Sequence, residues 1–385
     1  MHISPDHEFL QYCGRIDFDD PKAPVMVFPC TFVRMRFTGD KLCVTLENNR
    51  AYWDNYMGYI LDGEQGRFLL PIEEKCCIDI PVEKEQKEHE ILLFKRMDSC
   101  HTVKFYGFSI GDGESVLEPP PLPVRKIEVY GDSVSAGEVS EAVEFAGKED
   151  PEHNGEYSNS WYSYSWLTAR KLGAQLHDIA QGGIALMDGT GWFHEPDYIG
   201  MESAYDKISY QPELGEIKSW DFSKYRPHVV VIAIGQNDSH PVDFMKDNPA
   251  GEMSLKWKKH YKSFVERIRS IYPAAAIILT TTVLNHAKEW DDAIEEIAAG
   301  MGDDRVYHFL YKKNGCGTPG HIRIPEAEEM AEELSAFIES LGDGIWEAQD
   351  YDKNLMKMKD YVGGVSCDFR LEKSLAFPIK ETKTD

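Results

Sequence analysis

Three short runs of glycine and polar residues, together with one histidine, carry groups suited to acyl transfer. The runs are Gly131-Asp132-Ser133, Gln181-Gly182-Gly183 and Gly235-Gln236-Asn237-Asp238, and the histidine is His321. A serine hydroxyl is a poor nucleophile until a nearby base removes its proton, so Ser133 would need His321 as its general base. We expect Asp132 to be structural and to hold the turn at Ser133 through backbone hydrogen bonds.

The same runs offer hydrogen-bond donors for the oxyanion of a tetrahedral intermediate, which needs donors already in place. The backbone N–H of Ser133, a backbone N–H at Gly182 or Gly183, and the side-chain amide of Asn237 could supply three. Glycine lets the backbone approach a substrate closely. Gly182 is slightly preferred over Gly183.

The runs follow predicted strands, which explains how distant residues could meet. Predicted strands cover residues 127–130, 176–180, 229–234, 276–283 and 306–310, and predicted helices cover residues 160–172, 254–271 and 325–341. This alternation predicts a three-layer α/β domain with a parallel sheet. Ligands of such sheets bind beyond the carboxyl ends of the strands. Because His321 lies just before a predicted helix, it is preferred as the base over His240 and His286.

The chain before residue 118 has the period-two pattern of β-strands. Val33, Met35 and Phe37 alternate with arginines, and after a turn at residues 38–41 the alternation resumes, which predicts a hairpin. Further strands are predicted at residues 57–61, 77–80, 91–95 and 104–110. We therefore expect a β-sandwich over residues 1–118, a proline-rich linker at 119–123, and the α/β domain at 124–341.

These motifs resemble the sequence blocks of the SGNH/GDSL hydrolases. Gly131-Asp132-Ser133 followed by Gly137 is similar to the first block, Gly182 or Gly183 to the second, Gly235–Asp238 to the third (G-x-N-D), and His321 to the last. A jelly-roll-like domain before the α/β domain, with the segment Gly14-Arg15-Ile16-Asp17-Phe18, resembles carbohydrate esterase family two. The resemblance implies a flavodoxin-like catalytic domain and a serine esterase that removes acetyl groups from xylo- and manno-oligosaccharides.

The last block departs from the pattern of the superfamily. That block is written D-x-x-H, but the third residue before His321 is Thr318. Some family-two esterases use a Ser–His dyad in which a backbone carbonyl holds the imidazole, and we expect such a dyad here. An acid reaching in from elsewhere is the alternative, since the imidazole N–H needs only an acceptor.

Two further segments have a functional and a structural interpretation. The long acidic loop at residues 138–156 is either a solvated loop or a wall over the site. Trp192 and Phe193 could line the substrate site by stacking on a sugar ring, or could be ordinary packing residues.

Two other functions remain open. One is an SGNH esterase or thioesterase for longer acyl chains, because pocket shape sets acyl length. The other is a non-catalytic carbohydrate-binding protein with a vestigial site.

Composition limits the partners that we expect. The formal net charge of −25 over 385 residues disfavours nucleic acid and anionic membranes as partners.

None of the eight cysteines forms a C-x-x-C pair, and we expect the cysteines to be mostly reduced and buried. We expect no metal or cofactor. The N-terminus lacks the pattern of a signal peptide, which predicts a cytoplasmic protein. A homo-oligomer is compatible with the sequence, and the extension at residues 342–385 has no predicted role.

Overall fold

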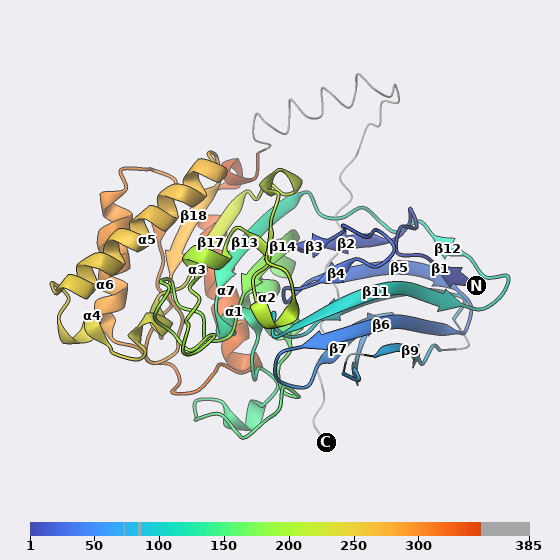
Figure 1. Cartoon of the computed structure of the whole chain (residues 1–385). Helices are drawn as coiled ribbons and strands as arrows, with labels where there is room; N and C mark the ends of the chain where they lie inside the picture. The colour runs from blue at the N-terminus through green and yellow to red at the C-terminus, as the bar shows by residue number, and fades with distance from the viewer. Residues whose placement is uncertain (73, 84–85, 348–385) are drawn as a thin grey trace.

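The computed structural model describes residues 1–72, 74–83 and 86–347. An all-β part lies at one end of the molecule and an α/β part at the other (Figure 1). This arrangement confirms the predicted fold class. Nearly all of the extension at residues 342–385, which has no predicted role, lies outside the described residues.

The all-β part is a sandwich of two antiparallel six-stranded sheets. One sheet has the order β3-β4-β11-β6-β9 with β1 beside β11, and the other has the order β12-β5-β10-β7-β8 with β2 beside β5. The strands are β1 (His2–Ile3), β2 (Gln11–Cys13), β3 (Ile16–Asp17), β4 (Val25–Met26), β5 (Phe32–Thr38), β6 (Leu42–Arg50), β7 (Tyr56–Leu61), β8 (Glu64–Leu69), β9 (Lys75–Ile80), β10 (Glu88–Lys95), β11 (His101–Ile110) and β12 (Val116–Leu117).

The predicted hairpin at residues 33–46 is wrong in its pairing, although both of its strands exist. β5 pairs with β2, β10 and β12, whereas β6 pairs with β9 and β11 in the opposite sheet. Val33, Met35 and Phe37 are fully buried between the sheets. Alternation of side chains identifies an inward face, but both sheets of a sandwich have one, so the pattern does not identify the partner strand.

The α/β part is built on a five-stranded parallel sheet with the order β14-β13-β17-β18-β19. Its strands are β13 (Arg125–Gly131), β14 (Ala174–Ala180), β17 (Val229–Ala233), β18 (Ala276–Thr280) and β19 (Val306–His308). The five residues of β17 are all buried, as expected of a strand covered on both faces.

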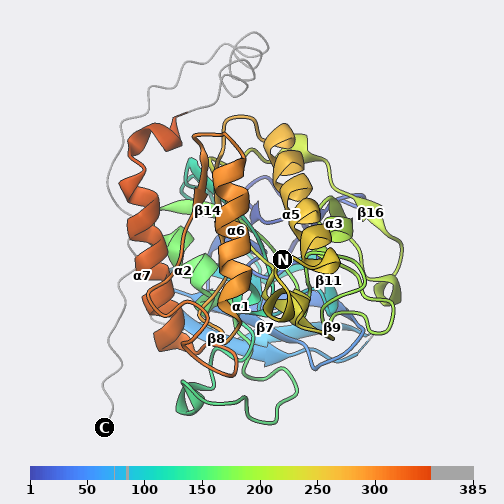
Figure 2. The same cartoon turned by 90° about the vertical axis from the view of Figure 1, so that its left-hand side faces the viewer.

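Helices cover both faces of this sheet (Figure 2). α2 (Tyr164–Lys171) and α7 (Ile324–Ser340) pack on one face, and α5 (Glu252–Ile271) and α6 (Lys288–Gly300) pack on the other. The remaining elements are α1 (Ser133–Ala136), α3 (Met201–Ala204), α4 (Phe244–Asp247), β15 (Lys207–Ser209), β16 (Lys218–Ser219), η1 (Val143–Phe145), η2 (Ser160–Tyr162), η3 (Pro212–Leu214), η4 (Phe222–Lys224), η5 (Gln236–Ser239) and η6 (Asp343–Trp346).

Two helix predictions need correction. The helix predicted at residues 160–172 is interrupted, because Ser163 takes an extended conformation and caps α2 by accepting a hydrogen bond from the Trp166 N–H. Helix α6 was not predicted from the sequence.

A buried arginine joins the two parts of the molecule. Arg15, between β2 and β3, is fully buried and lies 3.4 Å from the Glu128 carboxylate on β13. One guanidinium nitrogen also donates to the Tyr205 carbonyl at 2.6 Å. A buried charge is tolerated only where it is paired and hydrogen-bonded, so this contact fixes the sandwich against the sheet.

The cysteines follow the prediction in part. Five described cysteines are free, of which Cys316 is exposed, whereas Cys43 and Cys77 on the neighbouring strands β6 and β9 form a disulfide that was not predicted.

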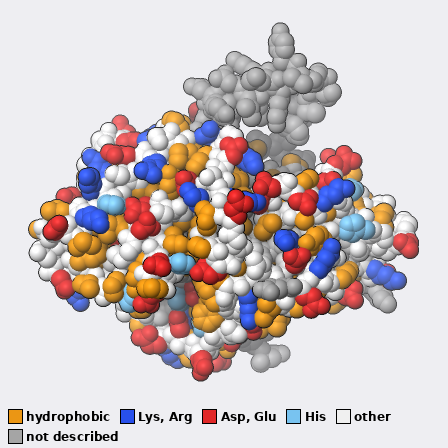
Figure 3. Space-filling model, in the orientation of Figure 1, with side chains coloured by type: hydrophobic (Ala, Val, Ile, Leu, Met, Phe, Trp, Pro, Cys, Tyr) orange, Lys and Arg blue, Asp and Glu red, His pale blue; other side chains and the backbone are white. Residues whose placement is uncertain are grey.

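Acidic and basic side chains are interspersed on the visible face of the molecule (Figure 3). Among the described residues, no helix has the length and apolar character needed to span a membrane.

Candidate active site

The segment that contains Ser133 forms a tight turn from β13 into α1. Asp132 caps the helix, because its carboxylate accepts a hydrogen bond from the Val134 N–H at 3.0 Å, as predicted. Gly131 is required at the end of the strand, since a Cβ there would lie 2.1 Å from the Ser135 hydroxyl oxygen. Ser133 is 5% exposed, and its hydroxyl has no hydrogen-bond partner among the described residues.

The loop after β17 is fastened to this turn. The Asp132 carboxylate accepts a hydrogen bond from the side-chain amide of Gln236 at 2.8 Å and from that of Asn237 at 3.2 Å. The Asn237 amide also donates to the Ile184 carbonyl at 3.0 Å, in the loop after β14. The three predicted runs therefore meet at the carboxyl edge of the parallel sheet.

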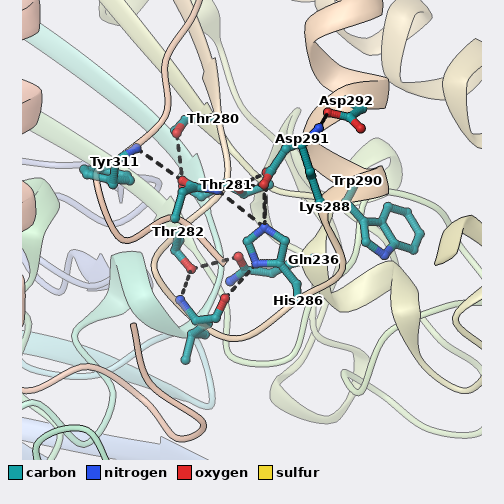
Figure 4. Close-up of polar contacts among 12 residues, drawn as sticks. Gln236, Thr280, Thr281, Thr282, His286, Lys288, Trp290, Asp291, Asp292 and Tyr311 are labelled. Carbon is teal, nitrogen blue, oxygen red and sulfur yellow. Dashed lines mark hydrogen bonds and ion pairs between the residues drawn. The ribbon is translucent and has the colours of Figure 1, made fainter. Parts of the chain in front are cut away.

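His286, an alternative to His321 as the base, belongs to a polar network next to this edge (Figure 4). Thr282 donates to the Gln236 side chain at 2.8 Å, which anchors the loop after β17 to the end of β18. In the same network the His286 ring contacts the Leu284 carbonyl through Nδ1 at 2.7 Å and Asp291 through Nε2 at 3.1 Å. Both ring nitrogens are occupied and the side chain is 2% exposed, so His286 is structural.

The two aromatic residues proposed to line the site have different environments. Trp192 is 59% exposed and stacks on the His240 ring with centroids 3.4 Å apart. Its backbone N–H donates to the Gly183 carbonyl at 2.8 Å, which places it beside the second run. Phe193 is 3% exposed and packs edge-on against Tyr210 in the core. The burial of Phe193 favours the packing alternative for this residue.

His321 is held by an acid, which corrects the expectation of a backbone carbonyl. Its Nδ1 lies 2.5 Å from the Asp150 carboxylate, and its backbone N–H donates to the same group at 2.9 Å. The buried Arg323 guanidinium also donates to Asp150 at 2.8 Å. Asp150 lies in the acidic loop at residues 138–156, so this loop forms part of the site. Burial opposes ionisation of Asp150, but the His321 and Arg323 hydrogen bonds outweigh it and lower the pKa well below its usual range.

The other ring nitrogen of His321 faces the segment that follows Ser133. Its Nε2 lies 3.9 Å from the Glu138 carboxylate, and the Glu138 N–H donates to the Ser133 carbonyl at 3.0 Å. Burial lowers the pKa of His321, but Glu138 and Asp150 outweigh it and raise the pKa to about 9. Burial raises the pKa of Glu138 to about 7, although His321 opposes the shift.

The predicted oxyanion donors differ in availability. The Gly182 N–H donates to the Asp98 carboxylate at 2.7 Å, and the Asn237 amide has the two protein acceptors described above. The N–H groups of Ser133 and Gly183 have no acceptor among the described residues. The geometry therefore favours Gly183 over Gly182, the reverse of the slight preference drawn from the sequence.

The sandwich contributes residues that sequence reasoning missed. Asp98, between β10 and β11, also accepts from the Gln181 side chain at 2.7 Å, and the Tyr52 hydroxyl accepts from the same amide at 3.0 Å. No motif surrounds Asp98, Tyr52 or Asp150. Only the length and acidity of the loop at residues 138–156 pointed to one of them.

A parallel five-stranded sheet with these loops at its carboxyl edge is consistent with the SGNH-type fold expected from the sequence. A family model for the carbohydrate esterase 2 N-terminal domain matches residues 12–120. The cellulase/esterase CelE of Acetivibrio thermocellus is 28% identical over 346 residues, which cover 87% of this chain but only 40% of the relative. The acetylxylan esterase / glucomannan deacetylase of Cellvibrio japonicus is 24% identical over 348 residues, covering 89% of this chain and 91% of the relative.

A solved structure extends the similarity to both parts of the molecule. It is a family two carbohydrate esterase from Clostridium thermocellum in complex with cellohexaose, with a TM-score of 0.72 and 27% identity, covering 86% of this chain and 98% of that one. Over both parts of the molecule the chain is thus similar to the family two carbohydrate esterases, and its fold is consistent with that of the SGNH/GDSL hydrolases.

Proposed function

We propose that this chain is a serine esterase that removes O-acetyl groups from carbohydrates through an acyl-enzyme. The observation that carries the proposal is the placement of His321, which contacts Asp150 through Nδ1 and directs Nε2 toward the segment of Ser133. In this arrangement Asp150 holds the imidazole in the tautomer that can accept a proton at Nε2.

The reaction proceeds in two halves. The Ser133 oxygen attacks the acetyl carbonyl carbon and its proton passes to His321 Nε2. The bond between the carbonyl carbon and the sugar oxygen then breaks, and the sugar oxygen takes the proton from Nε2, which leaves acetyl-Ser133. In the second half His321 Nε2 takes a proton from a water whose oxygen attacks the acetyl carbon. The bond between that carbon and the Ser133 oxygen then breaks, the Ser133 oxygen takes the proton from Nε2, and acetate and free Ser133 are released. These steps use no metal or cofactor.

The oxyanion of each half-reaction needs donors that are not already occupied. The N–H groups of Ser133 and Gly183 meet this condition. The Asn237 amide can join them by exchanging its contact with the Ile184 carbonyl for one with the substrate. Each such donor is worth on the order of 3 kcal/mol of transition-state stabilisation.

The carbohydrate part of the proposal is supported by the relatives and by the surface of the site. The named relatives are an acetylxylan esterase / glucomannan deacetylase and a cellulase/esterase, and the solved structure holds a cello-oligosaccharide. The exposed Trp192 ring beside Gly183 offers an apolar face on which a sugar ring can stack.

The test is acetate release from acetylated xylo-, manno- and cello-oligosaccharides by the wild type and by Ser133→Ala. We expect release by the wild type and none by the variant, while Ser270→Ala, an exposed serine on α5, serves as the matched control and keeps full activity. Acetate release that survives in Ser133→Ala would overturn the assignment. A preference for eight-carbon over two-carbon aryl esters would instead favour the longer-acyl esterase.

A further inference from the structure

Glu138 places a carboxyl group without a hydrogen-bond donor beside the imidazole of the site. It follows Gly137, whose left-handed conformation (φ 75°) ends α1 and turns the chain back. A Cβ at Gly137 would lie 2.6 Å from the Asn159 carbonyl oxygen, so glycine is needed there. The Glu138 side chain is 18% exposed, and no described residue donates a hydrogen bond to its carboxyl group. Solvent or a ligand can therefore reach it.

The neighbouring carboxylate of Asp98 differs in this respect. It accepts from the Gly182 N–H, from the Gln181 amide, and from the Cys100 N–H at 3.0 Å. A Cβ at Gly182 would lie 2.7 Å from the Glu138 carboxyl oxygen and 2.8 Å from that of Asp98, so both groups lie against this glycine. The Asp98 carboxylate therefore has three donors from the chain, whereas the Glu138 carboxyl group has none among the described residues.

The position of Glu138 relative to His321 limits its distance from any substrate. In the proposed reaction the departing sugar oxygen takes a proton from His321 Nε2 and must come within about 3 Å of it. Because the Glu138 carboxyl oxygen lies 3.9 Å from the same nitrogen, it lies at most about 7 Å from that sugar oxygen. A substituent on the neighbouring ring carbon can therefore contact Glu138.

We propose that Glu138 is a specificity-determining residue. Its carboxylate accepts a hydrogen bond from a sugar hydroxyl next to the ester. The same negative charge disfavours esters of sugars that carry a carboxylate on the same ring. This inference rests on the proposed function and deepens it, because it names the substrate class as esters of neutral sugars.

The charges around Glu138 allow its carboxylate to act in this way. The groups that interact with it are the His321 imidazole and the carboxylates of Asp98, Asp132 and Asp150. Because the pKa of Glu138 is raised to about 7, the group is mostly ionised at pH 8 and mostly protonated at pH 5.5. Two like charges about 7 Å apart near a protein surface repel by an amount that corresponds to about 50-fold in affinity. At pH 8 the protonated His321 beside Glu138 offsets part of this repulsion, so a smaller factor is expected.

The test measures binding in the Ser133→Ala background, so that no ligand is consumed. The two ligands are an acetylated galacturonide and its methyl ester, which differ in the charge on the sugar ring and in one methyl group. We expect calorimetry at pH 8 and low salt to give about 30-fold tighter binding of the methyl ester. Adding Glu138→Gln should reduce this ratio at least fivefold. Adding Glu149→Gln, which removes an exposed charge from the same loop, should leave the ratio unchanged.

A second measurement needs no change at Glu138. In Ser133→Ala the binding ratio should shrink between pH 8 and pH 5.5, because Glu138 becomes protonated while the galacturonide stays ionised. The inference is overturned by a ratio near one at pH 8, by a ratio that Glu138→Gln leaves unchanged, or by the absence of binding of either ligand. Failure of the esterase proposal would appear in a different measurement, as the absence of acetate release by the wild type. The binding ratio would still decide the role of Glu138 in that case.

Discussion

Replacement of Asp150 tests whether an acid from the loop at residues 138–156 completes the site. Asp150→Asn keeps the size of the side chain but removes the charge that faces His321 Nδ1 at 2.5 Å. An amide can also donate its N–H to Nδ1, which would favour the tautomer with its proton on Nε2, and that tautomer cannot accept the serine proton.

The size of the effect follows from the contacts of Asp150. Loss of one hydrogen bond to a charged group costs about 1.5–3 kcal/mol, or roughly 10- to 150-fold in rate. A wrong tautomer costs about 10⁴-fold in the Ser-His-Asp triad of a serine protease. Because the Asp150 side chain is 27% exposed and water can partly replace it, we expect kcat/KM to fall by about 10²- to 10⁴-fold.

The assay is hydrolysis of an aryl acetate between pH 5 and pH 10, with Glu149→Gln as the control for charge. Below its pKa of about 9, His321 is protonated and cannot act as a base, so kcat/KM of the wild type should rise with pH up to about 9. Asp150→Asn removes a carboxylate that raises the pKa of His321, so the increase of kcat/KM with pH should occur at lower pH in this variant. The triad would be refuted, and a dyad favoured, if Asp150→Ala kept more than about a third of wild-type activity and its pH profile did not move.

Three further predictions concern the surroundings of the site. Folding raises the pKa of Glu138 from its ordinary value of 4.5 to about 7, so wild-type stability should fall as pH rises through this window. In urea unfolding at pH 8, the free energy of unfolding of Glu138→Gln should exceed that of the wild type by up to about 3 kcal/mol, and the two should be equal at pH 4.5. Gly182→Ala should lower kcat/KM at least about tenfold with near-ultraviolet circular dichroism retained, because its Cβ would displace the carboxylates of Glu138 and Asp98. Arg15→Met should cost about 3–5 kcal/mol in chemical denaturation by leaving the buried Glu128 carboxylate unpaired, and a loss below about 1 kcal/mol would contradict the role given to this ion pair.

Local sequence patterns predicted the elements of the fold better than their pairing. The run at residues 229–234 and the alternation around Val33 and Phe37 identified strands, because burial on both faces or on one face imposes these patterns on a single segment. Which strands pair depends on distant segments, and β5 and β6 accordingly belong to opposite sheets. Helix α6 escaped prediction although Trp290, Ile294 and Ile297 form its buried face.

The same distinction applies to the site. Ser133, Asn237 and His321 follow strands or precede a helix in recognisable runs, and the parallel sheet brings such ends together. Asp150 and Asp98 lie in loops without a motif, and only the tertiary structure places their carboxylates against His321 and Gly182. Their recruitment depends on loop conformation, for which the sequence has no periodic signal.

Covalent labelling of Ser133 tests the central claim most directly. The protein is treated with a fluorophosphonate at pH 8, its remaining aryl-acetate hydrolysis is followed, and the labelled peptide is identified by mass spectrometry. The proposed mechanism predicts one label per chain on Ser133, a loss of activity in step with labelling, and greatly slowed labelling in His321→Gln. Full hydrolysis by a chain without a label, or a label on another residue that abolishes activity, would contradict it.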